Sequence, residues 1–155
     1  MVQACSYKSK IDSNYYCQKV KFSCIESNKV VNFKTSKGDF AVKLFGKDNP
    51  VTVSNFLENI ENNIYVIQKF YKIINYYQIK NPSETVNLVN TFESGSIAMV
   101  KSGKNKSSST EFFFVTTKIP ELDGRYSIFG KIIKGLDVLE KINKEDFIKA
   151  VQISN

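Results

Sequence analysis

The sequence predicts a mainly β protein in which about eight short antiparallel strands close into a barrel that is capped by two α-helices. Three observations support this fold class. Many short segments alternate apolar and polar residues, as half-buried strands do. Two segments have helical periodicity instead, one early and one late. Strands and helices do not alternate along the chain, which argues against a parallel sheet, and closure into a barrel removes the open edges of so many short strands.

The first elements follow an N-terminal extension, residues 1–29. Within it, segment 18–25 (QKVKFSCI) alternates in the manner of a strand. Strands are then expected at 30–35 and 39–45, joined by a turn at Ser36-Lys37-Gly38 in which glycine supplies the unusual backbone angle. These two strands predict a hairpin with one buried face.

A helix is expected to begin at Asn49, the predicted N-cap, with Pro50 in the first helical position. Asn62-Asn63 is its expected end. Its core stripe has helical spacing and comprises Val53, Phe56, Leu57, Ile60 and Ile64.

The second half of the chain supplies the remaining strands and the second helix. Residues 102–110 (SGKNKSSST) have the composition of a flexible loop. A helix is expected from Gly135 to Ile142, with Asp137 placed to pair with Lys141 one turn later. The expected strands lie at 67–74, 76–80, 96–101, 111–117, 126–133 and 146–154.

Composition narrows the function classes. The 155 residues fit one domain, and no run of about 18 apolar residues predicts a membrane span. The start, MVQACSYKSK, lacks the apolar core of a secretory signal, so a cytoplasmic or nuclear protein with reduced thiols is expected. The chain has no histidine, and its three cysteines, Cys5, Cys17 and Cys24, form no CxxC pair, so we expect neither a metal nor another cofactor. The absence of histidine also excludes catalysis by Ser-His and Cys-His pairs.

The net charge of +7 raises the question of nucleic acid. Arg125 is the only arginine among the 22 basic residues, and base-edge readout depends on arginine's planar fork. Lysines scattered along the whole chain favour a solvated surface over a nucleic-acid site. A strip of lysines and tyrosines at 69–80 keeps nucleic acid as a less favoured alternative ligand.

Two long segments resemble the cyclophilin family. The first, FKTSKGDFAVKLFGKDNPVTVSNFLENI, is similar to the family's opening hairpin and helix and contains Pro-Val-Thr-Val-Ser-Asn-Phe at 50–56. The second, from Gly95 to Ile142, contains the Gly-Ser-Ile-Ala-Met strand, a Ser/Thr-rich loop into Phe-Phe, a Leu-Asp-Gly turn and a Phe-Gly-Lys-Ile strand. Between them, KFYKII stands where the family has Phe-His-Arg. We therefore assign 30–155 to a cyclophilin-like domain.

This resemblance implies a groove on the outer face of the barrel that holds an X-Pro peptide and speeds cis/trans isomerisation. The uncatalysed barrier of about 18–20 kcal/mol reflects amide resonance. Lowering it needs a grip on the proline ring and hydrogen-bond donors for the twisted amide, without nucleophile or metal. The expected partner is a proline-containing peptide or protein, with no membrane contact.

The resemblance also implies which residues form the groove. The family's catalytic arginine aligns with Lys72, the pocket floor with Phe113, and an aromatic wall with Tyr77. The implied substrate-binding positions are Gln78, Lys80, Val100, Lys101, Glu111, Glu121, Leu122 and Tyr126. Among these, Lys80 stands for a glutamine, Lys101 for a backbone-binding asparagine, and Tyr126 for a histidine.

These replacements predict a groove that has lost many of its polar contacts while the core residues remain. Lysine does not replace the arginine fork, so we expect isomerase activity to be weak or lost. The alternative is a non-catalytic cyclophilin-like subunit or adaptor in a larger protein or ribonucleoprotein assembly.

Overall fold

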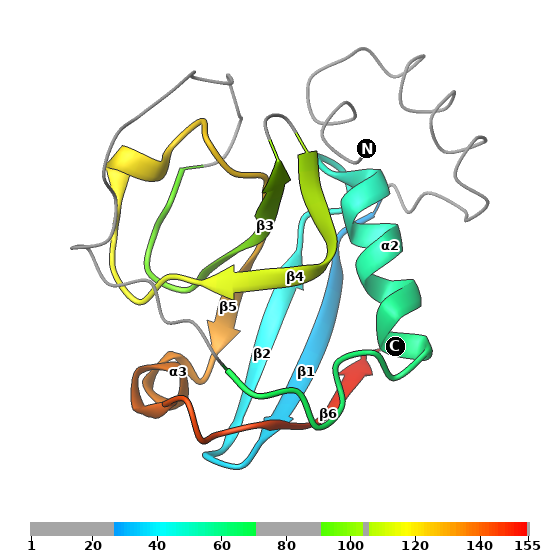
Figure 1. Cartoon of the computed structure of the whole chain (residues 1–155), viewed down its shortest axis with the longest axis vertical. Helices are drawn as coiled ribbons and strands as arrows, with labels where there is room; N and C mark the ends of the chain where they lie inside the picture. The colour runs from blue at the N-terminus through cyan, green and yellow to red at the C-terminus, as the bar shows by residue number, and fades with distance from the viewer. Residues whose placement is uncertain (1–26, 71–90, 104–105, 155) are drawn as a thin grey trace.

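The computed structural model describes residues 27–70, 91–103 and 106–154. The described strands form one antiparallel sheet in the order β4-β3-β5-β2-β1-β6, curved into an open half-barrel with two helices beside it (Figure 1). The strands are β1 (Lys29–Thr35), β2 (Asp39–Leu44), β3 (Ser96–Gly103), β4 (Lys106–Phe114), β5 (Ile128–Lys134) and β6 (Ile148–Ile153).

The mainly β class with two helices is confirmed, whereas the closed eight-stranded barrel is not. The predicted strands at 18–25 and 76–80, and the second half of 67–74, lie outside the described residues. Within 67–70, Lys69 forms an isolated antiparallel bridge with Phe147, next to β6. Closure of the barrel therefore stays a prediction.

The hairpin of β1 and β2 forms as predicted, because its alternation buries Val31, Phe33 and Thr35. Gly38 has a φ of 142°, and its carbonyl accepts hydrogen bonds from the Thr35 amide at 3.0 Å and the Thr35 hydroxyl at 2.6 Å. These bonds fix the turn and with it the register of the two strands.

The sheet curls far enough for its distant strands to touch. Phe114 on β4 meets Phe33 on β1 edge to face, with ring centroids 5.8 Å apart, and Phe40 on β2 at 5.3 Å. In Figure 1 β4 accordingly crosses in front of β2 and β1. The concave side encloses the first hydrophobic core, to which Phe56, Met99 and Phe129 also contribute.

Helix α2 (Pro50–Glu61) covers one side of this core and contacts β4 and β6. Asn49 is the N-cap residue and Pro50 opens the helix, as predicted, although the Asn49 side chain makes no capping hydrogen bond. Its amide group instead donates to the Ile128 carbonyl at 3.1 Å and accepts from the Ser127 hydroxyl at 3.3 Å. One detail of the helix prediction is wrong. Ile64 is 42% exposed instead of joining the core stripe, because the helix ends before it and Asn63 turns the chain with a φ of 56°.

Helix α3 (Leu136–Lys141) contacts β2, and its predicted Asp137–Lys141 ion pair is present at 3.3 Å. Gly135 precedes it with a φ of 84°. A Cβ there would lie 2.6 Å from the Asp39 carbonyl oxygen, so only glycine fits this approach of α3 to β2.

The predicted flexible loop at 102–110 is wrong over most of its length. β3 continues to Gly103 and β4 begins at Lys106, with Lys101 paired to Ser107. Serine-rich composition is typical of loops, but the ladder to a neighbouring strand overrides it, because strand propensity depends strongly on tertiary context.

Candidate functional site

A second hydrophobic cluster lies on the other face of β3. Ile97 and Met99 point into the first core, whereas Ala98 and Val100 belong to this second cluster. The cluster is completed by Phe113 on β4, Ile128 at the start of β5, and the connection between them, which supplies Val115, Ile119 and Leu122.

Phe113 lies at the centre of an aromatic group. Its ring is stacked on Phe92, with centroids 5.9 Å apart and planes 14° apart, and Tyr126 meets it edge-on at 5.2 Å. Phe92 is itself fixed by the Leu-Asp-Gly turn, because its amide donates to the Asp123 carboxylate at 2.6 Å. The turn is tight because Gly124 has a φ of 74°.

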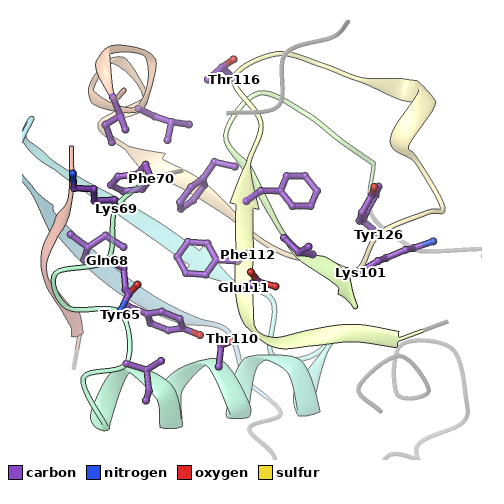
Figure 2. Close-up of a pocket in the computed structure, with 17 residues that line it drawn as sticks. Tyr65, Gln68, Lys69, Phe70, Lys101, Thr110, Glu111, Phe112, Thr116 and Tyr126 are labelled. Atoms are coloured by element: carbon purple, nitrogen blue, oxygen red, sulfur yellow. The ribbon is translucent and has the colours of Figure 1, made fainter. Parts of the chain in front are cut away.

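A pocket of about 640 Å³ opens beside this aromatic group and extends toward the first core (Figure 2). β3 and β4 supply one side, and the segment after α2 supplies the other. The described residues that line it are Ile64, Tyr65, Gln68, Lys69, Phe70, Val100, Lys101, Thr110, Glu111, Phe112, Phe113, Phe114, Thr116, Tyr126, Leu139, Ile142 and Ile148.

The structure brings together five of the residues predicted for the site: Val100, Lys101, Glu111, Phe113 and Tyr126. The other two described ones do not line the pocket. Leu122 is only 2% exposed and packs within the second cluster, whereas Glu121 is exposed on the short 3-10 helix Pro120–Leu122. Their role in substrate binding stays a prediction. Lys72, Tyr77, Gln78 and Lys80 lie outside the described residues.

Sequence reasoning missed the wall that Tyr65 forms opposite β4. Its ring packs against Phe56 at 5.0 Å and edge-on against Phe112 at 5.1 Å, and Asn59 donates a hydrogen bond to its hydroxyl at 3.0 Å. Burial raises the pKa of Tyr65 to about 12, and the Asn59 hydrogen bond opposes this only in part. The helical pattern of α2 gave no signal, because Tyr65 follows its end.

The charges at the pocket are spread out. Lys69 and Lys101 lie at opposite sides of the view, so they do not form one basic strip (Figure 2). Lys69 pairs with Glu145 at 3.1 Å. The ammonium of Lys101 lies 5.4 Å from the centre of the Tyr126 ring and forms no ion pair within the described part of the chain.

Comparison with known proteins identifies the family. Residues 30–155 match the model of the cyclophilin type peptidyl-prolyl cis-trans isomerase/CLD family. The chain is a cyclophilin. It is 32% identical over 139 residues to a peptidyl-prolyl cis-trans isomerase of Helicobacter pylori, a match that covers 79% of this chain and 85% of the relative. An Acinetobacter baylyi isomerase is 27% identical over 138 residues, covering 75% and 72%.

Solved structures agree with this cyclophilin fold. A cyclophilin type peptidyl-prolyl cis-trans isomerase of Cryptosporidium parvum superimposes with a TM-score of 0.69 at 22% identity, covering 83% of this chain and 99% of that one. The structure of the same relative in the presence of the dipeptide Ala-Pro superimposes with a TM-score of 0.67. The recognition of a cyclophilin from sequence motifs is therefore confirmed.

In the described ranges of this cyclophilin, no cluster of three or more histidine, cysteine, aspartate or glutamate side chains could hold a metal ion. Across the same ranges, no helix has the length and apolar character needed to span a bilayer.

Proposed function

We propose that this cyclophilin binds X-Pro segments of peptides or proteins in the groove over Phe113 and speeds their cis/trans isomerisation at a reduced rate. The observation that carries the proposal is the packing of Phe113 against Phe92 and Tyr126 beside an open pocket. An aromatic surface of this kind suits the apolar ring of proline. The Cryptosporidium parvum relative, solved in the presence of Ala-Pro, supports the same class of ligand for this chain.

The reaction requires no covalent chemistry from the protein. Twisting the X-Pro amide breaks its resonance and breaks no bond between atoms, so no nucleophile is needed. A groove lowers the barrier if it holds the twisted amide better than the planar one. In our proposal Phe113 and Val100 contact the proline ring, and the Lys101 ammonium and Tyr126 hydroxyl offer hydrogen bonds to the peptide.

The reduced rate rests on Lys72, which sequence register places where the family has its catalytic arginine. Lysine has a compact charge on a flexible stem and cannot reproduce two parallel N–H donors. If the exchange removes about 2 kcal/mol of transition-state stabilisation, the rate falls about 30-fold.

Exchange NMR with a short Ala-Pro peptide tests both parts of the proposal. Binding is expected to shift resonances of Phe113 and Tyr126, and catalysis is expected to produce exchange between the cis and trans peaks of the peptide. Lys72→Arg is expected to raise the exchange rate by up to about 30-fold. Lys149→Arg, at an exposed position on β6, makes the same chemical change away from the groove and should leave the rate as it is.

The outcomes separate three cases. Binding with exchange that Lys72→Arg increases supports a weakened isomerase. Binding without exchange in either form favours the non-catalytic subunit or adaptor. If no peptide binds to the chain or to the Lys72→Arg variant, the groove over Phe113 is not an X-Pro site and the proposal is wrong.

A further inference from the structure

We infer that Lys101 makes this groove prefer peptides that carry an acidic side chain beside the proline. The inference rests on the proposed function, because it names the class of peptide that the same groove selects. It depends on where β3 places the Lys101 side chain and on what surrounds its charge.

The Lys101 ammonium lies at the groove, 5.4 Å from the centre of the Tyr126 ring at the edge of the second cluster. Met99 points into the first core and Val100 toward the second cluster, so regular alternation would send Lys101 back toward the first core. The pairing of β3 with β4 is irregular at this point, because Met99 pairs with Phe112 and Lys101 with Ser107, which leaves the extra residues on β4. The ammonium reaches Tyr126 at the end of the long, flexible lysine stem.

The position of the ammonium at the groove edge explains why a charge is tolerated here. An unpaired ammonium in the first core, among Phe33, Phe56 and Phe129, would lose its hydration without gaining a partner. At the groove edge it stays partly exposed and rests on the negative face of the Tyr126 ring. The aromatic contact positions the ammonium but satisfies none of its three N–H donors.

The charge is therefore available to a ligand. Within the described residues, Lys69 is neutralised by Glu145 and Lys118 by Glu93, each at 3.1 Å, whereas Lys101 forms no ion pair. Tyr126 is the link to the site, because its ring also meets Phe113 edge-on at 5.2 Å. A peptide whose proline rests on Phe113 thus carries its neighbouring side chains past Tyr126, within reach of the flexible Lys101 stem.

The expected preference is modest. Ion pairs at partly exposed sites strengthen binding by about three- to fivefold, and they weaken as salt screens the charges. Glu111 also lines the pocket, and its negative charge opposes an acidic peptide. The inference places the ligand's acidic side chain on the Tyr126 side of the pocket, where the Lys101 ammonium lies 5.4 Å from the ring centre.

Binding of capped peptides to the full chain tests the inference. The set holds an all-alanine peptide around one proline, and versions with glutamate, glutamine or lysine just before or just after that proline. Affinities are measured by NMR titration at low and at physiological salt. Glutamine matches glutamate in shape, so the glutamate-to-glutamine affinity ratio isolates charge.

The wild-type ratio is expected to reach about three to five at one of the two positions, and to fall at physiological salt. Lys101→Gln should bring the ratio close to one, and Lys101→Arg should preserve it. Lys149→Gln is the matched control, because Lys149 is an exposed lysine on β6 outside the pocket, and it should leave the ratio unchanged.

Two results overturn the inference in different ways. If the all-alanine peptide binds but the ratio is one, or if Lys149→Gln lowers it as much as Lys101→Gln does, the preference is absent or nonspecific and the proposed function stands. If no peptide binds, the inference falls together with the proposed function.

Discussion

Replacing Tyr65 by phenylalanine should make the stability of this cyclophilin less sensitive to alkaline pH. The Tyr65 side chain is 3% exposed, between Phe56 and Phe112, and its hydroxyl accepts a hydrogen bond from Asn59. Its pKa rises from 10.0 to about 12 because burial disfavours the phenolate. The unfolded chain then releases this proton at lower pH than the folded chain does.

The sign and size of the effect follow from linkage. A raised pKa in the folded state means that the stability Tyr65 contributes is complete below about pH 10 and is lost as pH rises toward 12. One pKa unit corresponds to about 1.4 kcal/mol, so the loss reaches about 1.4 kcal/mol at pH 11 and about 2.7 kcal/mol well above pH 12. Near neutral pH, Tyr65→Phe removes one hydrogen bond and costs about 0.5–1.5 kcal/mol.

Chemical denaturation followed by circular dichroism, from about pH 8 to about pH 11, measures the free energy of unfolding of the wild type and of the Tyr65→Phe variant. Tyr65→Phe leaves every other side chain unchanged, so the difference between the two proteins isolates Tyr65. The wild type should lose about 1.4 kcal/mol relative to the variant over this range. A difference that stays constant with pH would refute the burial of this hydroxyl behind the pocket.

Two further predictions concern the scaffold. Gly130→Ala should destabilise the fold by about 1–3 kcal/mol and lower Tm by several degrees, because the added Cβ would lie 2.7 Å from the Lys43 carbonyl oxygen; an unchanged Tm in a thermal melt would contradict this close contact. Hydrogen bonds from the Asn143 amide and the Ser36 hydroxyl, each 2.9 Å long, lower the pKa of Asp146. The stability that this carboxylate contributes is therefore present above its ordinary pKa and lost as pH falls below it. Asp146→Asn should have a shallower acid-side stability curve than the wild type, and parallel curves would count against the assignment.

The local sequence predicted most of the first core and its hairpin. Alternation identified β1 and β2, and the helix that begins at Pro50 ends before Asn62 as expected. Such elements are predictable because their signals depend on neighbouring residues. Ile64 continues the helical spacing, and the predicted core stripe therefore included it. The helix ends before this residue, however, and its side chain lies at the surface.

The candidate site was predictable only in part. Phe113 and Tyr126 were identified by family resemblance and do line the pocket, whereas the buried Leu122 and the exposed Glu121 are not among its lining residues. Tyr65 was missed because its position in the pocket depends on how the chain returns after α2. A motif aligns residues along the chain, but it does not say which side of a packed cluster each one faces.

The order of strands, turns and family motifs was sufficient by itself to determine the cyclophilin fold, because these signals lie within short segments that agree with one another. Only the tertiary structure decided the state of the serine-rich segment and the direction of the Lys101 side chain. Pairing with β3 made a strand of the serine-rich segment, and the fold placed the Lys101 ammonium over the Tyr126 ring. Tyr126 lies in the connection between β4 and β5, so this contact forms only once β3, β4 and β5 are paired. The direction of the Lys101 charge is therefore a property of the folded sheet and not of its local sequence.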